Sequence, residues 1–175
     1  MSLESHLADL LHGHTSTPPT PFASNIVSRA KVKHATPGRV IFELPVEEDM
    51  LNGMDVVHGA VYALLIDTLT SICLLSHPSH PPPGTTVSLN LTYMSPASLG
   101  ETLQVLTDVV RVGGRVAVIQ AEVRTLDGGR DADDESGDNE VLTKKEGDSA
   151  KAKKEGKVCV KGMHVKYLVG RGPRL

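Results

Sequence analysis

Residues 60–76 read AVYALLIDTLTSICLLS and contain a single charged residue, Asp67. The apolar residues cover nearly the whole circumference of a helix, so we expect a helix from about Gly59 to Ser76 that other structure surrounds. The Pro-rich run HPSHPPPG at 77–84 cannot continue it. An ionised carboxylate in such a helix is costly to bury unless a partner or a reaction uses it. Asp67 is therefore the first candidate for a functional residue, and His58-Gly59 at the front of the helix is the second.

The segments around this helix read as strands. A hairpin is expected over 25–46 with its turn at Pro37-Gly38, and Gly113-Gly114 is expected to form a second tight turn. Runs rich in β-branched residues predict further strands at 85–94, 102–112, 115–126 and 157–169. Residues 2–12 predict a short amphipathic helix capped by Ser2, and residues 47–52 a polar loop. The pattern β-β-α-β-β-β-β indicates an α+β fold, in which an antiparallel sheet wraps around one long central helix.

Charge is concentrated in one segment of the chain. Residues 127–157 hold 10 of the 21 acidic and 7 of the 18 basic residues, so this segment accounts for the net charge of −3. The segment is poor in apolar residues, and we expect a disordered insert at about 127–156 between the last two strands. The predicted organisation is an N-terminal helix and Pro-rich connector over 1–24, one domain over 25–170, and a tail over 171–175. The charge balance and the 3% aromatic content argue against a nucleic-acid partner.

The two cysteines, Cys73 and Cys159, both lie in apolar runs, and their spacing indicates neither a disulfide framework nor a metal clip. We expect buried thiols in a reducing compartment, the cytoplasm or the mitochondrion, with the cytoplasm slightly favoured. The N-terminus shows no secretory signal. The run from Val56 to Ser76 contains His58 and Asp67, which favours a buried helix over a membrane span. His77 and His80 have no carboxylate or Cys close by in sequence, so no metal site is expected.

Several stretches together resemble one enzyme family. They are NGMDVVHGA at 52–60, LID at 65–67, GTTVSLNLTYMSP at 84–96, LGE at 99–101 and GMHVK at 162–166. This pattern resembles the hotdog-fold acyl-CoA thioesterases, in particular the phenylacetate-pathway type and its eukaryotic relatives in the thioesterase superfamily. The resemblance covers roughly residues 40–126 and 157–169. The chain departs from the pattern at Ala60, where the family commonly has a second glycine.

The resemblance implies a hotdog fold and hydrolysis of acyl-CoA thioesters to a free carboxylic acid and coenzyme A. The backbone N–H of Gly59, at the start of a helix, is suited to polarise a thioester carbonyl. Asp67 matches the general base or nucleophile, Asn52 a residue that orients the attack, and Thr86 a hydroxyl that holds the water. His58 would position groups rather than act as a base. No metal or separate cofactor is implied, since coenzyme A is part of the substrate.

The spacing of His58 and Asp67 bears on assembly. Nine residues on a helix correspond to about 180° of rotation and roughly 13 Å of rise, so the two side chains cannot share a site within one chain. Either one of them is not functional, or the site forms between two chains. The resemblance implies the second case, in which Asn52, His58 and Gly59 of one subunit face Asp67 of the partner subunit. We therefore expect a homodimer with composite active sites that assembles further into a homotetramer.

Coenzyme A carries phosphates, so cations and free amides should lie near its groove. The candidates are Arg111, Arg115 and Lys166, with the backbone N–H groups of Gly113 and Gly114. By resemblance, the segment of Tyr93, Met94, Ser95 and Pro96 also lines the coenzyme side.

Other functions stay open at this level. A hotdog dehydratase acting on 3-hydroxyacyl thioesters would use a His in another residue pattern. A module that binds acyl-CoA without turnover is favoured if the Ala60 methyl blocks the carbonyl pocket. A structural protein that recruits a partner through the insert would have no need of Asp67, which would then pair with an Arg of a neighbouring strand.

Overall fold

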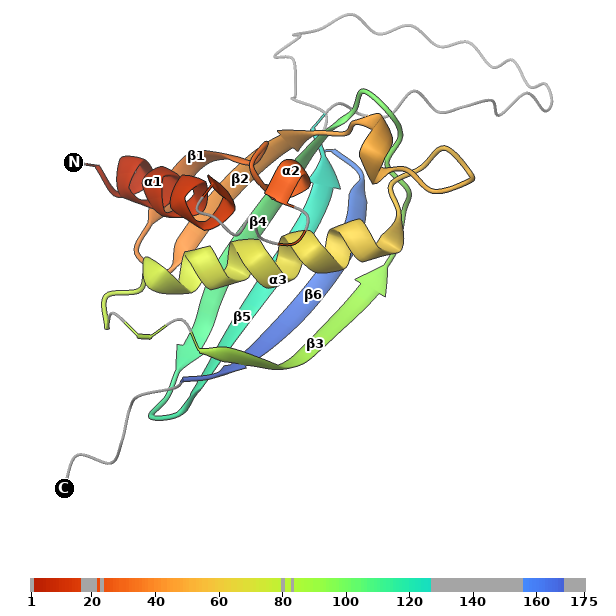
Figure 1. The fold of residues 1–175 in the computed structure, drawn as a ribbon. Helices are drawn as coiled ribbons and strands as arrows, with labels where there is room; N and C mark the ends of the chain where they lie inside the picture. Colours follow the sequence, from red (N-terminus) through yellow and green to blue (C-terminus); the bar gives the residue numbers. More distant parts are fainter. Residues whose placement is uncertain are drawn as a thin grey trace, which may run out of the picture.

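An antiparallel sheet of six strands packs on one face against a long helix, as the sequence predicts (Figure 1). The computed structural model describes residues 2–16, 22, 24–79, 81–82, 84–126 and 156–168. The helical elements are α1 (Leu3–Ser16), α2 (Ser24–Val27), the 3-10 turn η1 (Glu48–Met50) and α3 (Gly59–Leu75). The strands are β1 (Lys31–Thr36), β2 (Arg39–Pro45), β3 (Thr85–Tyr93), β4 (Thr102–Val112), β5 (Val116–Thr125) and β6 (Val158–Tyr167).

Helix α3 lies in the hollow of the sheet and forms the centre of the core (Figure 1). Leu65, Ile66 and Leu69 are completely buried, because the helix is covered by the sheet on one side and by the N-terminal segments on the other. The helix begins where His58 Nδ1 accepts a hydrogen bond from the Ala60 N–H, a side-chain cap. It ends at Leu75, two residues before the His77-Pro78 bond.

The strand order is β1-β2-β4-β5-β6-β3, so the strand that follows α3 in sequence lies at one edge of the sheet beside the last strand. The pairing of β3 with β6 sets Thr86 opposite Lys166 and Leu89 opposite His164. Gly162 of β6 lies under the helix, where an added Cβ would meet Leu91 Cδ2 at 2.8 Å and Ile66 Cδ1 at 3.1 Å. This close approach brings the middle of α3 down onto β6.

The N-terminal region agrees with the sequence in part. Helix α1 forms with Ser2 Oγ accepting from the Ser5 N–H, and its Leu7 and Leu11 are buried. The prediction that a strand starts near residue 25 is wrong, since α2 occupies 24–27 and β1 begins at Lys31. The neighbouring residues Ile26 and Val27 are both buried, which one turn of helix allows and an extended strand does not. The predicted charged insert lies almost wholly outside the described residues, as does the C-terminal tail.

None of the described helices is long and apolar enough to cross a membrane. Cys73 and Cys159 are buried and unpaired, as predicted. Burial raises the pKa of the Cys73 thiol to about 11.

Candidate active site

Asp67 projects from α3 toward the outer pair of strands, β6 and β3. Its side chain is 45% exposed, and the Thr86 hydroxyl on β3 donates a hydrogen bond to Asp67 Oδ1 at 2.8 Å. The same carboxylate oxygen lies 3.4 Å from Nε2 of His164 on β6. Asp67 and Thr86, two residues predicted separately for the site, are therefore in direct contact, and the carboxylate still has a face open to solvent.

His164 lies behind this pair and is completely buried. Its Nε2 is 3.0 Å from Thr86 Oγ1, and its Nδ1 is 2.6 Å from Thr70 Oγ1 on α3. Burial lowers the pKa of His164, and the positive charge of Lys166 lowers it further, while the negative charge of Asp67 acts in the opposite direction. The imidazole is thus held neutral beside a carboxylate.

The predicted position of Lys166 is wrong. It was expected near the phosphates of coenzyme A, but it is 5% exposed and its Nζ donates to Ser71 Oγ of α3 at 2.6 Å. Burial lowers the pKa of its ammonium, and the charge of Asp67 partly offsets that effect. Because alternate residues of a strand face opposite sides, Lys166 shares the inner face of β6 with His164.

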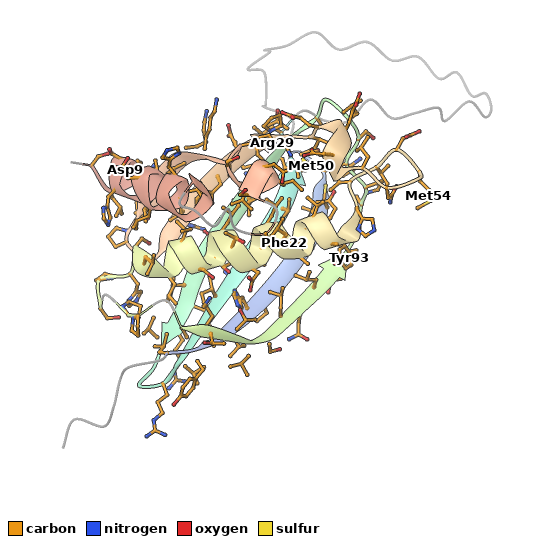
Figure 2. The ribbon with its side chains drawn as sticks, viewed as in Figure 1. Asp9, Phe22, Arg29, Met50, Met54 and Tyr93 are labelled. Atoms are coloured by element: carbon orange, nitrogen blue, oxygen red, sulfur yellow. The ribbon has the colours of Figure 1, made fainter. Side chains whose placement is uncertain are left out.

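The second group of predicted residues surrounds the start of α3. The Tyr93 hydroxyl donates to the Gly59 carbonyl at 3.1 Å, and Figure 2 shows Tyr93 beside that end of the helix. The Asn52 side-chain carbonyl accepts from the Met54 N–H at 2.8 Å, so this residue shapes the exposed loop that precedes the helix. His58 is exposed while its Nδ1 caps the helix. Gly59 is the first helical residue, so its N–H has no intrahelical acceptor.

A pocket of about 280 Å³ opens at this end of α3. Its lining consists of Val57, Gly59, Tyr62, Tyr93, Met94, Ser95 and Pro96. The four predicted coenzyme-side residues from Tyr93 to Pro96 thus share one pocket with the amide expected to polarise the thioester. The pocket is mostly apolar, as an acyl or pantetheine chain requires.

The remaining residues predicted for coenzyme A lie at the turn between β4 and β5. Arg111, Gly114 and Arg115 are exposed there, consistent with a role on a surface. The Gly113 N–H is not free for a phosphate, because it donates to the Val116 carbonyl at 2.7 Å and closes the hairpin turn. The prediction that the Gly113 N–H binds a phosphate is therefore wrong, because the hydrogen bond that closes the turn already uses it.

The two groups of residues are separated along the helix. Gly59 contacts Tyr93 at the last residue of β3, whereas Asp67 contacts Thr86 near its first residue. Eight residues of α-helix separate Gly59 from Asp67, a rise of about 12 Å. One thioester group cannot bridge that distance, so the two groups of residues in one chain cannot act on the same thioester.

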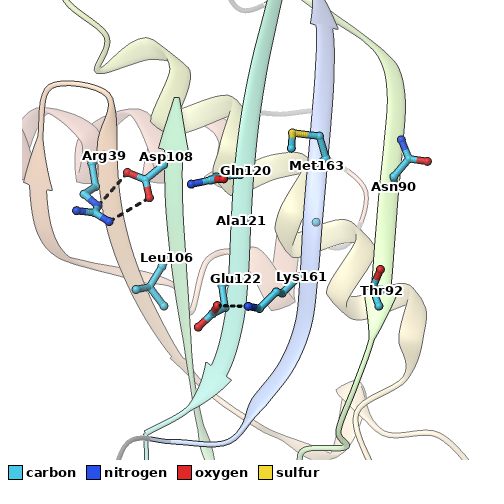
Figure 3. A pocket seen from close by; sticks show the side chains of 11 residues that line it. Arg39, Asn90, Thr92, Leu106, Asp108, Gln120, Ala121, Glu122, Lys161 and Met163 are labelled. Atoms are coloured by element: carbon cyan, nitrogen blue, oxygen red, sulfur yellow. Dashed lines mark hydrogen bonds and ion pairs between the residues drawn. The ribbon is translucent and has the colours of Figure 1, made fainter. Parts of the chain in front are cut away.

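A different hollow lies on the opposite face of the sheet (Figure 3). Its volume is about 560 Å³, and ion pairs between Arg39 and Asp108 and between Lys161 and Glu122 cross its floor. None of the residues around Asp67 lines it. Among the described residues, no three His, Cys, Asp or Glu side chains are grouped so that they could hold a metal ion.

Sequence reasoning missed His164, Thr70 and Ser71 as neighbours of Asp67. Two signals were available. Thr70 and Ser71 follow Asp67 by three and four residues, so they lie on its side of the helix. His164 and Lys166 alternate with Met163 and Val165, which places two polar residues on one face of a strand.

A long helix packed in the hollow of an antiparallel sheet defines a hotdog-fold protein. Asp67 with Thr86 beside the middle of the helix, and the Gly59 N–H at its start, are groups suited to acyl transfer. Residues 54–132 match the sequence profile of the Thioesterase superfamily. Acyl-coenzyme A thioesterase 13 from Homo sapiens is 34% identical over 98 residues, which are 56% of this chain and 69% of that protein. The chain belongs to the thioesterase superfamily.

Solved structures show the same fold. Zebrafish thioesterase superfamily member 2 superposes with a TM-score of 0.73 at 23% identity, over 96% of this chain and 99% of that one. A hypothetical thioesterase from Streptococcus pneumoniae, solved with coenzyme A, superposes with a TM-score of 0.60 at 16% identity, over 81% of this chain and 86% of that one. These likenesses establish the hotdog fold predicted from the sequence.

Proposed function

We propose that this protein hydrolyses acyl-CoA thioesters to a free carboxylic acid and coenzyme A at sites formed between two subunits. Family membership and the relative named an acyl-coenzyme A thioesterase support the reaction. The observation that carries it is the contact of Thr86 Oγ1 with Asp67 Oδ1 at 2.8 Å on an otherwise apolar helix. A half-exposed carboxylate beside a hydroxyl is an arrangement that can orient and deprotonate a water molecule.

The distance between the Gly59 group and the Asp67 group supports a dimer. Strand β3 is an edge strand with Val87 and Tyr93 exposed, and an unpaired edge is a surface that a second copy can extend. If two β3 strands paired antiparallel about a two-fold axis near Leu89, the first residues of each strand would lie beside the last residues of the other. The Tyr93 end of one chain, with Gly59, would then lie beside Thr86 and Asp67 of the partner subunit.

The chemistry of the composite site follows from the groups that it brings together. The Gly59 N–H polarises the thioester carbonyl and stabilises the developing oxyanion with the helix dipole behind it. Asp67 of the partner subunit, oriented by Thr86, removes a proton from the attacking water or attacks the carbonyl itself. Asn52 orients the reacting groups, and His58 caps the N-terminus of α3 through its Nδ1. The thiolate of coenzyme A leaves and takes up a proton.

The binding of coenzyme A is assigned to the surface around the pocket at Gly59. The S. pneumoniae structure with coenzyme A shares this fold, which supports a coenzyme site on a hotdog scaffold. In this dimer the exposed cations Arg111 and Arg115 would come from the partner subunit, because they lie at the end of the sheet where β3 begins. Met94, Ser95 and Pro96 line the route to the carbonyl.

A homotetramer is the larger assembly that we propose. The outer face of the sheet carries charges of both signs, Arg39 and Asp108 together with Lys161 and Glu122, beside exposed Met163 (Figure 3). A mixed pattern of this kind is complementary to itself under a two-fold rotation.

The unpaired thiols of Cys73 and Cys159 support a reducing compartment, the cytoplasm or the mitochondrion.

The reaction is tested by measuring thiol release from short, long and aromatic acyl-CoA esters. We expect turnover by the wild type and a loss of at least about 100-fold in kcat for Asp67→Ala. Asp9→Ala is the matched control, because Asp9 is an exposed carboxylate on α1, which carries none of the site residues, and its loss should not affect kcat. No turnover by a folded wild type that still binds acyl-CoA would contradict the enzyme and favour a binding module.

The composite site has a separate test by complementation. Asp67→Ala and Asn52→Ala chains are each inactive as homodimers on this proposal. A hybrid of the two contains one site with both residues intact, so co-expressed and separated hybrids should recover about half of the wild-type kcat per dimer. Hybrids as inactive as their parents would place both residues in one chain's site.

A further inference from the structure

His164 is a completely buried imidazole next to the catalytic carboxylate, and the mechanism above gives it no task. Its ring lies between α3 and the inner face of the sheet, with Leu89 and Ile119 as its strand neighbours in register. Both ring nitrogens contact hydroxyl groups, Thr70 on one side and Thr86 on the other. These contacts determine where the hydrogens of the ring can lie.

The Nδ1 side is fixed by Thr70. The Thr70 hydroxyl lies 2.5 Å from the Ile66 carbonyl, one helical turn back, and donates its only hydrogen to that acceptor. The 2.6 Å contact between Thr70 Oγ1 and Nδ1 must then use a hydrogen on the ring. His164 is therefore a donor at Nδ1, and in the neutral ring Nε2 carries a lone pair.

The Nε2 side then lacks one hydrogen. Thr86 Oγ1 lies 2.8 Å from Asp67 Oδ1 and 3.0 Å from Nε2, and one hydroxyl hydrogen cannot serve both acceptors. A single added proton on Nε2 satisfies both contacts, since Nε2–H then donates to Thr86 and Thr86 donates to Asp67. The cluster thus contains a place for one proton beside the base.

We propose that His164 receives, through the Thr86 hydroxyl, the proton that Asp67 removes from the attacking water. This inference rests on the proposed thioester hydrolysis. Water gives one proton to the Asp67 carboxylate and its oxygen forms the new bond to the acyl carbon. The proton moves on to Thr86 as Thr86 passes its own to Nε2, so Asp67 is again a carboxylate. When the C–S bond breaks, the stored proton returns through Thr86 and Asp67 to the thiolate, and the carboxylic acid loses the second water proton to solvent.

The charges around the ring fit this role. Lys166, also on the inner face of β6, and Asp67 on α3 are the charged groups that act on His164, while Thr86 is the polar contact from β3. Burial and the Lys166 ammonium lower the pKa of His164, which favours a neutral ring that can accept a proton during the reaction. The negative charge of Asp67 favours the protonated ring that forms during the reaction.

The test compares His164→Gln with the wild type in pH profiles of kcat and kcat/KM. We expect kcat to fall about 100-fold with KM changed less than about twofold, as for loss of a proton-transfer group. The acid limb of the profile should also move, because the His164 imidazole no longer titrates. His34→Gln, at an exposed position of β1, is the control and should keep both values and the limb. An acid limb that stays in place in His164→Gln would make His164 structural and overturn the relay.

A second measurement does not depend on turnover. Nitrogen-15 NMR of the wild type should show the His164 ring as the Nδ1–H tautomer near neutral pH, and Thr70→Val should reduce that tautomer. An Nε2–H ring in the wild type would overturn the proposal even if His164→Gln failed to fold. Absence of turnover by the wild type would overturn both the proposed hydrolysis and the proton relay. An active wild type with an Nε2–H ring would overturn the proton relay alone.

Discussion

The phenol hydroxyl of Tyr93 donates a hydrogen bond to the main-chain carbonyl of Gly59 at 3.1 Å. A Cβ added at Gly59 would lie 3.5 Å from Tyr93 Cε1, so the ring lies within van der Waals reach of a side chain at this position. The last residue of β3 thus packs on the first residue of α3. This contact holds the Gly59–Ala60 peptide, which directly follows the Gly59 N–H that is proposed to polarise the thioester.

Replacement of Tyr93 by Phe is the first prediction. Tyr93→Phe removes one hydrogen bond and keeps the ring, so we expect the free energy of unfolding to fall by about 0.5–1.5 kcal/mol. We also expect kcat/KM to fall by roughly threefold to tenfold, since Gly59 is held less firmly at the start of the helix. Urea denaturation and acyl-CoA kinetics measure the two effects. Tyr167→Phe, on the outer face of β6, should change neither; equal values for both variants would contradict the assignment.

The close packing of α3 on β6 gives a second prediction. Gly162→Ala places a methyl group against Leu91 and the fully buried Ile66, so we expect a loss of about 1–3 kcal/mol in the free energy of unfolding. Gly114→Ala is matched in chemistry, and its Cβ would meet nothing within 4 Å. Chemical denaturation of both variants measures the difference. A Gly162→Ala protein as stable as the wild type would show that the helix can move away from the strand at no cost.

The sequence was sufficient for α3, for the turns at 37–38 and 113–114, and for naming Asp67 and Thr86 as candidates, although it did not predict their contact. These features depend on local periodicity and on motifs within short segments. The position of His164 was not predictable in the same way, because its partner Thr86 is 78 residues away and depends on β3 lying beside β6. Lys166 was misplaced because both faces of β6 contain apolar residues, so alternation alone does not say which face is inside. Residues 26 and 27 were misread as strand because two adjacent apolar residues are too short a run to show either a helical or a strand period.

The lowered pKa of His164 predicts a pH dependence of stability. An unfolded histidine takes up its proton near pH 6.5, whereas the buried ring does so only at a lower pH. Between these values the unfolded chain binds more protons, so the free energy of unfolding should fall as the pH falls below about 6.5. Urea denaturation between pH 8 and pH 5 should show a weaker fall in His164→Gln than in the wild type. His34→Gln should retain the wild-type dependence, and parallel curves for all three proteins would contradict the prediction.

The exposed edge of the sheet gives the last prediction. Val87 on β3 is 65% exposed although it is apolar, and β3 has a partner strand on only one side. Val87→Lys should place a charge in the pairing of two β3 edges and shift the protein from dimer to monomer in sedimentation experiments. In the monomer, Asp67 and Thr86 would no longer face Gly59 of a partner subunit. We therefore expect kcat to fall in proportion to the dimer fraction, although none of these residues is changed.

Val110→Lys is the matched control for the edge strand, since Val110 is 54% exposed on β4, away from β3. It should leave both the dimer and kcat unchanged. A monomeric Val87→Lys protein with full activity would show that one chain contains the complete site. A Val87→Lys protein that remains dimeric and active would place the contact between subunits elsewhere than along β3.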